Sequence, residues 1–177
     1  MSSDGIGQVG RVTLVLGGAR SGKSARAQTI AEAASPTRLY LATAQAFDDE
    51  MRDRIARHRA DRAEGWRTVE CPLDLPEAIG REAAAGAVLL VDCLTLWASN
   101  LLLADEDADA ATDRLLTTLA AAPCPVVIVS NEVGLGIVPD NALARRFRDI
   151  AGRMNQRVAA ASDDVVLMMA GLELRLK

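Results

Sequence analysis

Short apolar segments alternate with longer alanine-rich or amphipathic segments along most of the chain. Continuous aliphatic runs that end in glycine, aspartate or serine predict strands buried on both faces. Strands of this kind are predicted at residues 12–16, 87–91 and 125–130. A short strand at 39–42 and a weak one at 68–71 are also predicted. Two closing strands, 165–169 and 172–176, are expected to form an antiparallel hairpin through a tight turn at Ala170-Gly171.

Helices are predicted between these strands. They are residues 23–34, 48–61, 75–84, 94–103, 112–122 and 141–162. Asp48 and Asp74 stand where N-caps are needed, and Pro76 fits a first helical turn. We interpret the acidic stretch 105–109 as a solvated loop and helix start rather than a cation site. Strands that alternate with helices indicate a doubly wound, mainly parallel α/β sheet, which binds ligands at the carboxyl ends of its strands.

The composition of the chain limits its possible domain number, core and partners. A chain of 177 residues suits one domain, and we expect it to span residues 11–177 after a flexible tail at 1–10. With 32 alanines and five aromatic residues, the core must consist of small aliphatic side chains. The formal charge of -4 argues against a general affinity for nucleic acid.

Targeting and redox signals are weak. The apolar runs are far shorter than the about 20 residues of a membrane span, so none is expected. The polar, glycine-rich start lacks the apolar core of a signal peptide, which favours a cytoplasmic protein. Cys71, Cys93 and Cys124 have no metal-binding or disulfide spacing, and we expect three reduced thiols.

A phosphate-binding loop is predicted between the first strand and the first helix. The segment Gly17-Gly18-Ala19-Arg20-Ser21-Gly22-Lys23-Ser24 matches the P-loop pattern in which Gly, four free residues, Gly and Lys precede Ser or Thr. Backbone N–H groups and the helix N-terminus can then converge on phosphate oxygens. Lys23 would reach the β- and γ-phosphates, and the Ser24 hydroxyl would ligate Mg²⁺. Asp92, at the end of another apolar strand, is either a second group for Mg²⁺ or a polar residue that ends the strand.

His58 is the only histidine of the chain. Its spacing from Met51 and Ile55 continues an apolar stripe, which is typical of a partly buried helix histidine. Four arginines surround it in sequence and could instead neutralise a triphosphate; they are Arg54, Arg57, Arg59 and Arg62. A neutral imidazole can attack the α-phosphorus of a nucleotide, and flanking cations favour the neutral ring.

Several motifs together resemble one enzyme family. Besides the P-loop, they are Asp48-Asp49-Glu50-Met51, Arg54-Ile55 before His58, Trp66-Arg67-Thr68 before Glu70, and residues 130–139. The chain resembles the bifunctional adenosylcobinamide kinase/adenosylcobinamide-phosphate guanylyltransferase family of cobalamin synthesis over about residues 12–177. One departure is Arg57, where some members place a second histidine, and this leaves His58 as the sole candidate.

The resemblance implies a two-step activity. ATP or GTP phosphorylates the aminopropanol hydroxyl of adenosylcobinamide, and GTP then donates GMP to that phosphate. By the same resemblance His58 carries the GMP, and the fold is a RecA-like P-loop domain assembled as a homotrimer. The implied nucleotide-binding residues outside the P-loop are Ala42, Thr43, Ala44, Arg59, Ala60, Asp61, Arg62, Glu70 and Asp92.

Other residues leave alternatives open. The loop 131–139 suits substrate contact or a lid, and equally a rigid connector or a subunit contact. Within it, Glu132 is a candidate for activating the cobinamide hydroxyl. Trp66 and Trp97 are expected to pack rather than to stack on a ring. Two further hypotheses for the whole chain are a small-molecule kinase with P-loop activity alone and an NTP-dependent assembly module.

Overall fold

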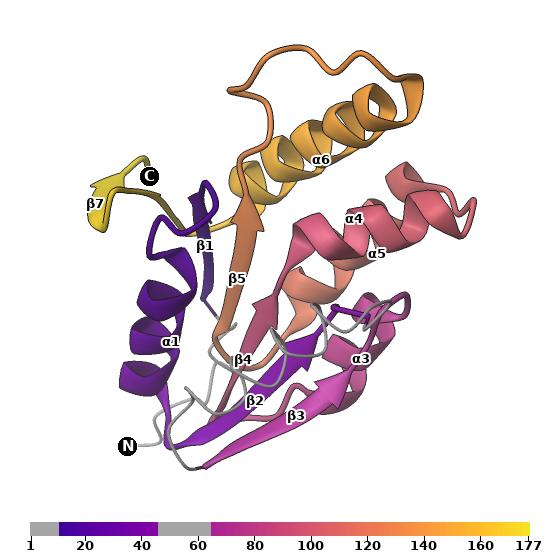
Figure 1. Cartoon of the computed structure of the whole chain (residues 1–177). Coiled ribbons are helices and arrows are strands. Elements are labelled where there is room, and N and C mark those ends of the chain that lie inside the picture. The colour runs from indigo at the N-terminus through magenta and orange to yellow at the C-terminus, as the bar shows by residue number, and fades with distance from the viewer. Residues whose placement is uncertain (1–10, 46–64) are drawn as a thin grey trace, which may run out of the picture.

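A seven-stranded sheet with helices on both faces makes up the described part of the chain (Figure 1). The computed structural model describes residues 11–45 and 65–177. The strands are β1 (Val12–Gly17), β2 (Thr37–Ala42), β3 (Trp66–Glu70), β4 (Ala87–Asp92), β5 (Val126–Asn131), β6 (Asp164–Met169) and β7 (Leu172–Arg175). The described helices are α1 (Lys23–Ala34), α3 (Leu75–Glu82), α4 (Leu94–Leu103), α5 (Ala108–Ala121) and α6 (Ala142–Ala161). The expected tail at 1–10 and helix at 48–61 lie outside the described residues.

The strand order is β3-β2-β4-β5-β1-β6-β7, and only β7 is antiparallel to its neighbour. This confirms the expected mainly parallel α/β fold and the closing hairpin. All six residues of β1 are buried, because the strand lies between β5 and β6 with helices over both faces. The parallel strands bring their carboxyl ends to one edge of the sheet.

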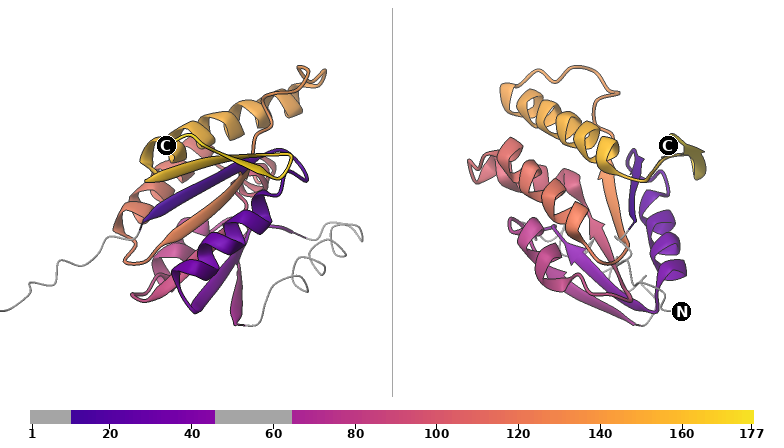
Figure 2. Two further views of the ribbon diagram at one scale, coloured as in Figure 1. Left: turned by 90° about the vertical axis from the view of Figure 1, so that its left-hand side faces the viewer. Right: turned by 180° about the vertical axis from the view of Figure 1, so that it is seen from behind.

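The helices divide unequally between the two faces, as Figure 2 shows from behind. Helix α1 packs alone among the described helices on one face, where Ala27 and Ala31 are fully buried and allow close approach to the sheet. Helices α3 to α6 cover the other face, where the larger apolar cluster lies. In that cluster Trp97 is fully buried and its indole N–H donates to the carbonyl of Leu73 (2.9 Å), which confirms its expected packing role.

Helix boundaries follow the local signals with two differences. Helix α5 begins at Ala108, earlier than expected, because the Asp107 carboxylate caps it by accepting from the N–H groups of Asp109 and Ala110. Asp74 occupies the N-cap of α3, but its side chain makes no capping hydrogen bond. Asn141 caps α6 through a bond from the N–H of Ala144 (2.8 Å).

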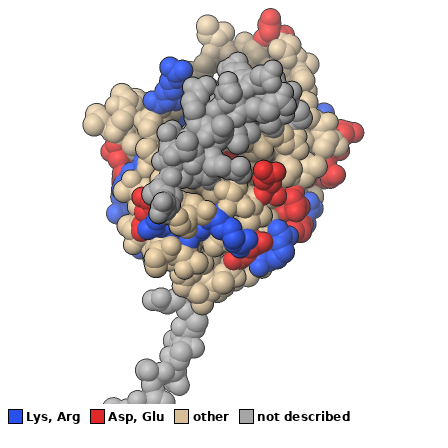
Figure 3. All heavy atoms as spheres, turned by 60° about the horizontal axis from the view of Figure 1, so that its bottom comes forward, with Lys and Arg blue, Asp and Glu red and all other residues tan. Residues whose placement is uncertain are grey.

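The surface and the thiols agree with the composition. On the face seen in Figure 3, acidic and basic side chains of the described residues are interspersed instead of forming one basic surface. No described helix has the length and apolar character needed to cross a membrane. All three cysteines are free and buried, and burial raises the pKa of the Cys71 thiol to about 12.

Candidate nucleotide-binding site

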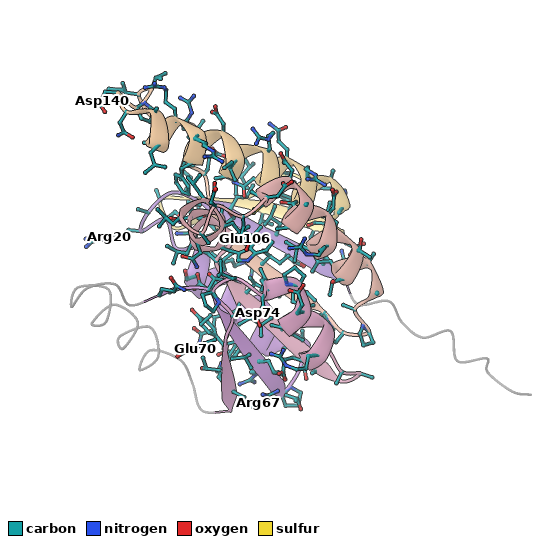
Figure 4. The ribbon with its side chains drawn as sticks, turned by 90° about the vertical axis from the view of Figure 1, so that its right-hand side faces the viewer. Arg20, Arg67, Glu70, Asp74, Glu106 and Asp140 are labelled. Atoms are coloured by element: carbon teal, nitrogen blue, oxygen red, sulfur yellow. The ribbon has the colours of Figure 1, made fainter. Side chains whose placement is uncertain are left out.

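The P-loop lies at the carboxyl edge of the sheet between β1 and α1. Gly22 takes a left-handed conformation (φ 96°) at the N-cap of α1, a backbone shape that glycine adopts without strain. Lys23 follows as a largely buried residue, and its Nζ donates to the carbonyl of Gly18 (3.2 Å) across the loop. Arg20, by contrast, extends outward from the loop (Figure 4). The loop is therefore curled around its lysine, as phosphate binding requires.

The C-terminal hairpin supports this loop from outside. The N–H of Gly171, in the β6–β7 turn, donates to the carbonyl of Ser21 (3.0 Å). Glu173 on β7 forms an ion pair with Arg26 in the first turns of α1. The Ser21 hydroxyl oxygen is buried without a hydrogen-bond partner among the described residues, so a polar atom inside the loop is left for a ligand to satisfy.

Three expected site residues lie in one row across neighbouring strands. Ala42 on β2 pairs in register with Glu70 on β3 and with Asp92 on β4. Each is the last residue of its strand, so their side chains start from the same level of the carboxyl edge. Glu70, labelled in Figure 4, is exposed there, whereas Asp92 is half-buried.

Asp92 is held by a chain of aromatic contacts. Its Oδ2 accepts a hydrogen bond from the Tyr40 hydroxyl (2.9 Å). The Tyr40 ring packs edge-on against Trp66, with ring centroids 6.3 Å apart. The indole N–H of Trp66 donates to Glu32 Oε1 on α1 (3.3 Å). The carboxylate at the end of β4 is thus tied to β2, β3 and α1.

The P-loop lysine and Asp92 act on the same neighbour, Cys93. Burial first, and then the negative charge of Asp92, raise the pKa of the Cys93 thiol to about 11, while the Lys23 ammonium lowers it by a smaller amount. A thiol with this pKa is protonated near neutral pH and is a poor nucleophile.

Thr43 joins the ends of β2 and β4. Its fully buried hydroxyl donates to the carbonyl of Cys93 and accepts from the Cys93 N–H, both at 2.8 Å. The Asn100 side chain donates to the carbonyl of Thr43 (2.8 Å) and so anchors the same turn to α4. The Thr43 side chain is accordingly occupied within the protein.

The end of β5 is fixed beside the P-loop. The N–H of Glu132 donates to the carbonyl of Gly17 (3.2 Å), and Glu132 Oε1 accepts from the N–H of Gly134 (2.7 Å). A buried polar network holds the strand end: Ser130 donates to Asn155 Oδ1 (2.6 Å), and the Asn155 amide donates to the carbonyl of Asn131 (3.1 Å). Glu132 is thereby held next to the first residue of the loop.

The structure thus brings together the P-loop, residues 42–44, Glu70, Asp92 and Glu132 at one edge. His58, Arg59, Ala60, Asp61 and Arg62 lie outside the described residues, and their assignments stay predictions. Sequence reasoning missed Tyr40 and Glu173. Tyr40 could have been found from strand periodicity, because it shares a face of β2 with Ala42 and pairs with Leu90, two residues before Asp92.

The fold and the site together show to which class of protein the chain belongs. A P-loop after β1 and an acidic end on β4, with β5 between the two strands, make the chain a P-loop NTPase with RecA-like strand placement. Two solved structures from Pyrococcus horikoshii share the fold at low sequence identity. A KaiC-like protein aligns with a TM-score of 0.50 and 13% identity, covering 89% of this chain and 70% of that one. A second protein gives 0.55 and 10%, covering 96% and 87%.

Sequence comparison places the chain within that class. The family model for cobinamide kinase / cobinamide phosphate guanyltransferase matches residues 13–176. The bifunctional adenosylcobalamin biosynthesis protein CobP of Pseudomonas aeruginosa is 49% identical, covering 93% of this chain and 96% of the relative. The corresponding CobU of Salmonella typhimurium is 45% identical, covering 93% and 98%. The chain belongs to the cobinamide kinase / cobinamide phosphate guanyltransferase family, and it is a kinase and guanylyltransferase of adenosylcobalamin biosynthesis.

Proposed function

We propose that the chain phosphorylates the aminopropanol hydroxyl of adenosylcobinamide with ATP or GTP and then transfers GMP from GTP to that phosphate. The product is adenosylcobinamide-GDP. The observation that carries the proposal is a P-loop closed around Lys23 in a chain that matches the family model over nearly its whole length. Both reactions are displacements at phosphorus, so one phosphate-binding loop can serve both.

In the first reaction the P-loop residues 17–24 hold the donor phosphates. Their backbone N–H groups and the N-terminus of α1 stabilise negative charge, and Lys23 adds a buried cation. The acceptor oxygen forms a bond to the γ-phosphorus while the bond to the leaving nucleoside diphosphate breaks. The proposed nucleotide contacts of Ala42, Thr43, Ala44, Glu70 and Asp92 lie at the same edge.

We assign Mg²⁺ to the Ser24 hydroxyl and the Asp92 carboxylate. Oxygen donors of this kind fit the ion, which takes one or two protein oxygens and completes its shell with phosphates and water. No group of three or more His, Cys, Asp or Glu side chains that could hold a metal ion occurs among the described residues. When bound, the ion would neutralise charge on the phosphates.

Tyr40 should strengthen Mg²⁺ binding at this site, because its hydroxyl donates a hydrogen bond that fixes one oxygen of Asp92. A hydrogen bond to a charged group contributes about 1.5–3 kcal/mol, so Tyr40→Phe should raise the Mg²⁺ concentration for half-maximal nucleotide binding by about tenfold. The ring contact with Trp66 is kept by phenylalanine. Nucleotide binding titrated with Mg²⁺ measures the effect, and binding in excess chelator is the control. An unchanged Mg²⁺ requirement would remove Tyr40 from the site.

In the second reaction His58 is the nucleophile. Its neutral imidazole attacks the α-phosphorus of GTP, the bond to pyrophosphate breaks, and a phosphoramidate forms. The terminal oxygen of adenosylcobinamide phosphate then displaces the histidine. Gln45, the last described residue before the segment that carries His58, follows β2 at the carboxyl edge, where the P-loop also lies.

Labelled GTP tests the two-step proposal. Wild-type protein is incubated with GTP labelled at the α- or the γ-position, denatured, and counted. We expect acid-labile, alkali-stable label from the α-position alone, near one label per chain. Addition of adenosylcobinamide phosphate before denaturation should move it into adenosylcobinamide-GDP. Unlabelled protein under turnover conditions would overturn the covalent step.

The alternatives give different results in the same assay. A kinase with P-loop activity alone would phosphorylate adenosylcobinamide and never retain the α-phosphate. An assembly module would hydrolyse nucleotide without using adenosylcobinamide at all.

On the basis of the family resemblance, we also propose that the chain forms a homotrimer in the cytoplasm. Exposed apolar side chains on the edge strand β7, Leu172 and Leu174, support assembly, because edge strands of this kind are usually covered. Light scattering of the purified protein measures the molecular mass.

A further inference from the structure

A cavity of about 590 Å³ opens beside the P-loop on the face of the sheet opposite α1. Its inner end is Leu16, the residue before Gly17, and Glu132, whose N–H is bonded to Gly17. The outer wall is one side of α6, with Arg148, Gln156 and Ala159 among its lining residues. The cavity therefore begins beside Gly17, the first residue of the P-loop.

The lining combines three chemical characters. Leu16 and Ala159 are apolar, Glu132 and Asp149 are carboxylates that accept hydrogen bonds, and Arg148 and Arg153 are cations. Arg148 contacts a single oxygen of Asp149 through Nε and Nη2, which leaves other donors of its guanidinium for a ligand. Such a wall suits a short hydroxyl-bearing arm that becomes a phosphate ester during the reaction.

An exposed loop with large apolar side chains adjoins the cavity. The loop 132–141 borders it through Glu132 and Gly134, and its large side chains point into solvent: Leu135 is 81% and Ile137 98% exposed. Exposed apolar side chains next to a polar cavity mark a surface for an amphipathic partner. A corrinoid has this chemistry, because its ring is broad and largely apolar whereas its arms are polar.

We propose that this cavity is the acceptor site, with the aminopropanol arm inside and the corrin ring on Leu135 and Ile137. The inference rests on the proposed function and names where its acceptor binds. In the first step the hydroxyl donates its proton to the Glu132 carboxylate as its oxygen bonds to the γ-phosphorus and the nucleoside diphosphate departs. Arg148 then faces the new phosphate, which is the nucleophile of the second step.

Direct binding of two corrinoids tests the site. Equilibrium dialysis, followed by the visible absorbance of the corrin, is run with adenosylcobinamide and with adenosylcobinamide phosphate. Because a guanidinium contributes mainly to binding of the anion, Arg148→Ala should weaken the phosphate ligand about tenfold and the other ligand less than about threefold. Ile137→Ser should weaken both about fivefold, because it removes apolar contact with the ring.

Matched controls lie elsewhere on the surface. Arg114→Ala removes an exposed arginine paired with Glu77 on α3, and Leu103→Ser removes an exposed leucine at the end of α4. Both controls should bind both corrinoids like the wild type. Equal losses in controls and test variants, or unchanged binding in Arg148→Ala and Ile137→Ser, would overturn the acceptor site. So would a change of molecular mass in Ile137→Ser with unchanged binding, since the loop would then be a subunit contact.

Failure of the proposed function is recognised separately. Retention of α-label from GTP needs no acceptor, so all four variants should retain it like the wild type. A wild-type protein that binds corrinoids as expected but retains no label contradicts the histidine step and leaves the acceptor site standing. A wild-type protein that binds neither corrinoid would contradict both the proposed function and the acceptor site.

Discussion

His58→Ala should abolish retention of α-label and lower guanylyl transfer by at least about 10⁴-fold, because loss of a covalent nucleophile removes the pathway. Phosphorylation of adenosylcobinamide should fall by less than about tenfold, since that step needs the P-loop and no histidine adduct. His58→Asn should behave like His58→Ala, because an amide nitrogen is a poor nucleophile. The two rates are measured separately, with adenosylcobinamide for the kinase step and preformed adenosylcobinamide phosphate for the transfer.

The surviving kinase activity serves as the control for folding and nucleotide binding in the His58 variants. Added imidazole offers a second check, since a free imidazole can take the place of the missing side chain. Equal loss of both activities would contradict separate chemical roles. Full guanylyl transfer without His58 would show direct attack of the acceptor phosphate on GTP.

Local patterns were enough to predict the elements that carry the site. The P-loop was predicted from eight adjacent residues, since its geometry depends on glycines and a helix start that are close in sequence. Asp92 was predicted at a strand end, whereas Glu70 was predicted within the strand 68–71 and its role was implied by the family resemblance. Parallel pairing places both level with Ala42. Residues 105–109 were interpreted as a solvated loop and helix start, but the helix itself was predicted only from 112. The Asp107 cap places the start of α5 at Ala108.

Contacts between distant parts of the chain could not be predicted in this way. The bond from Gly171 to Ser21 joins the last hairpin to the first loop, and neither residue type signals the other. Glu173 gave only the signal of an exposed acidic residue on an edge strand, although it pairs with Arg26 on α1. Such contacts depend on strand order, which places β6 beside β1.

Gly17→Ala should disrupt both activities, because no side chain fits at this position. A Cβ there would lie 2.4 Å from Ser21 Oγ and 2.8 Å from the carbonyl oxygen of Met168 on β6. The serine can rotate, but the carbonyl belongs to a paired strand, so the loop itself must shift. A displacement of about 1 Å can cost about 100-fold in rate, and we expect at least that loss in kinase activity and in α-label retention. Overpacking should also lower the free energy of unfolding by about 1–3 kcal/mol.

Gly18→Ala is the matched control for Gly17→Ala. It adds the same methyl group one residue later, where no atom lies within 4 Å and the P-loop pattern leaves the residue type free. Nucleotide affinity, both activities and thermal unfolding are compared for the two variants. Met168 belongs to the hairpin that supports the loop. If Gly17→Ala keeps normal nucleotide affinity, β6 must have shifted to make room for the methyl group. The hairpin would then not hold the P-loop in place. Equal losses in the two variants would contradict the steric explanation for Gly17→Ala.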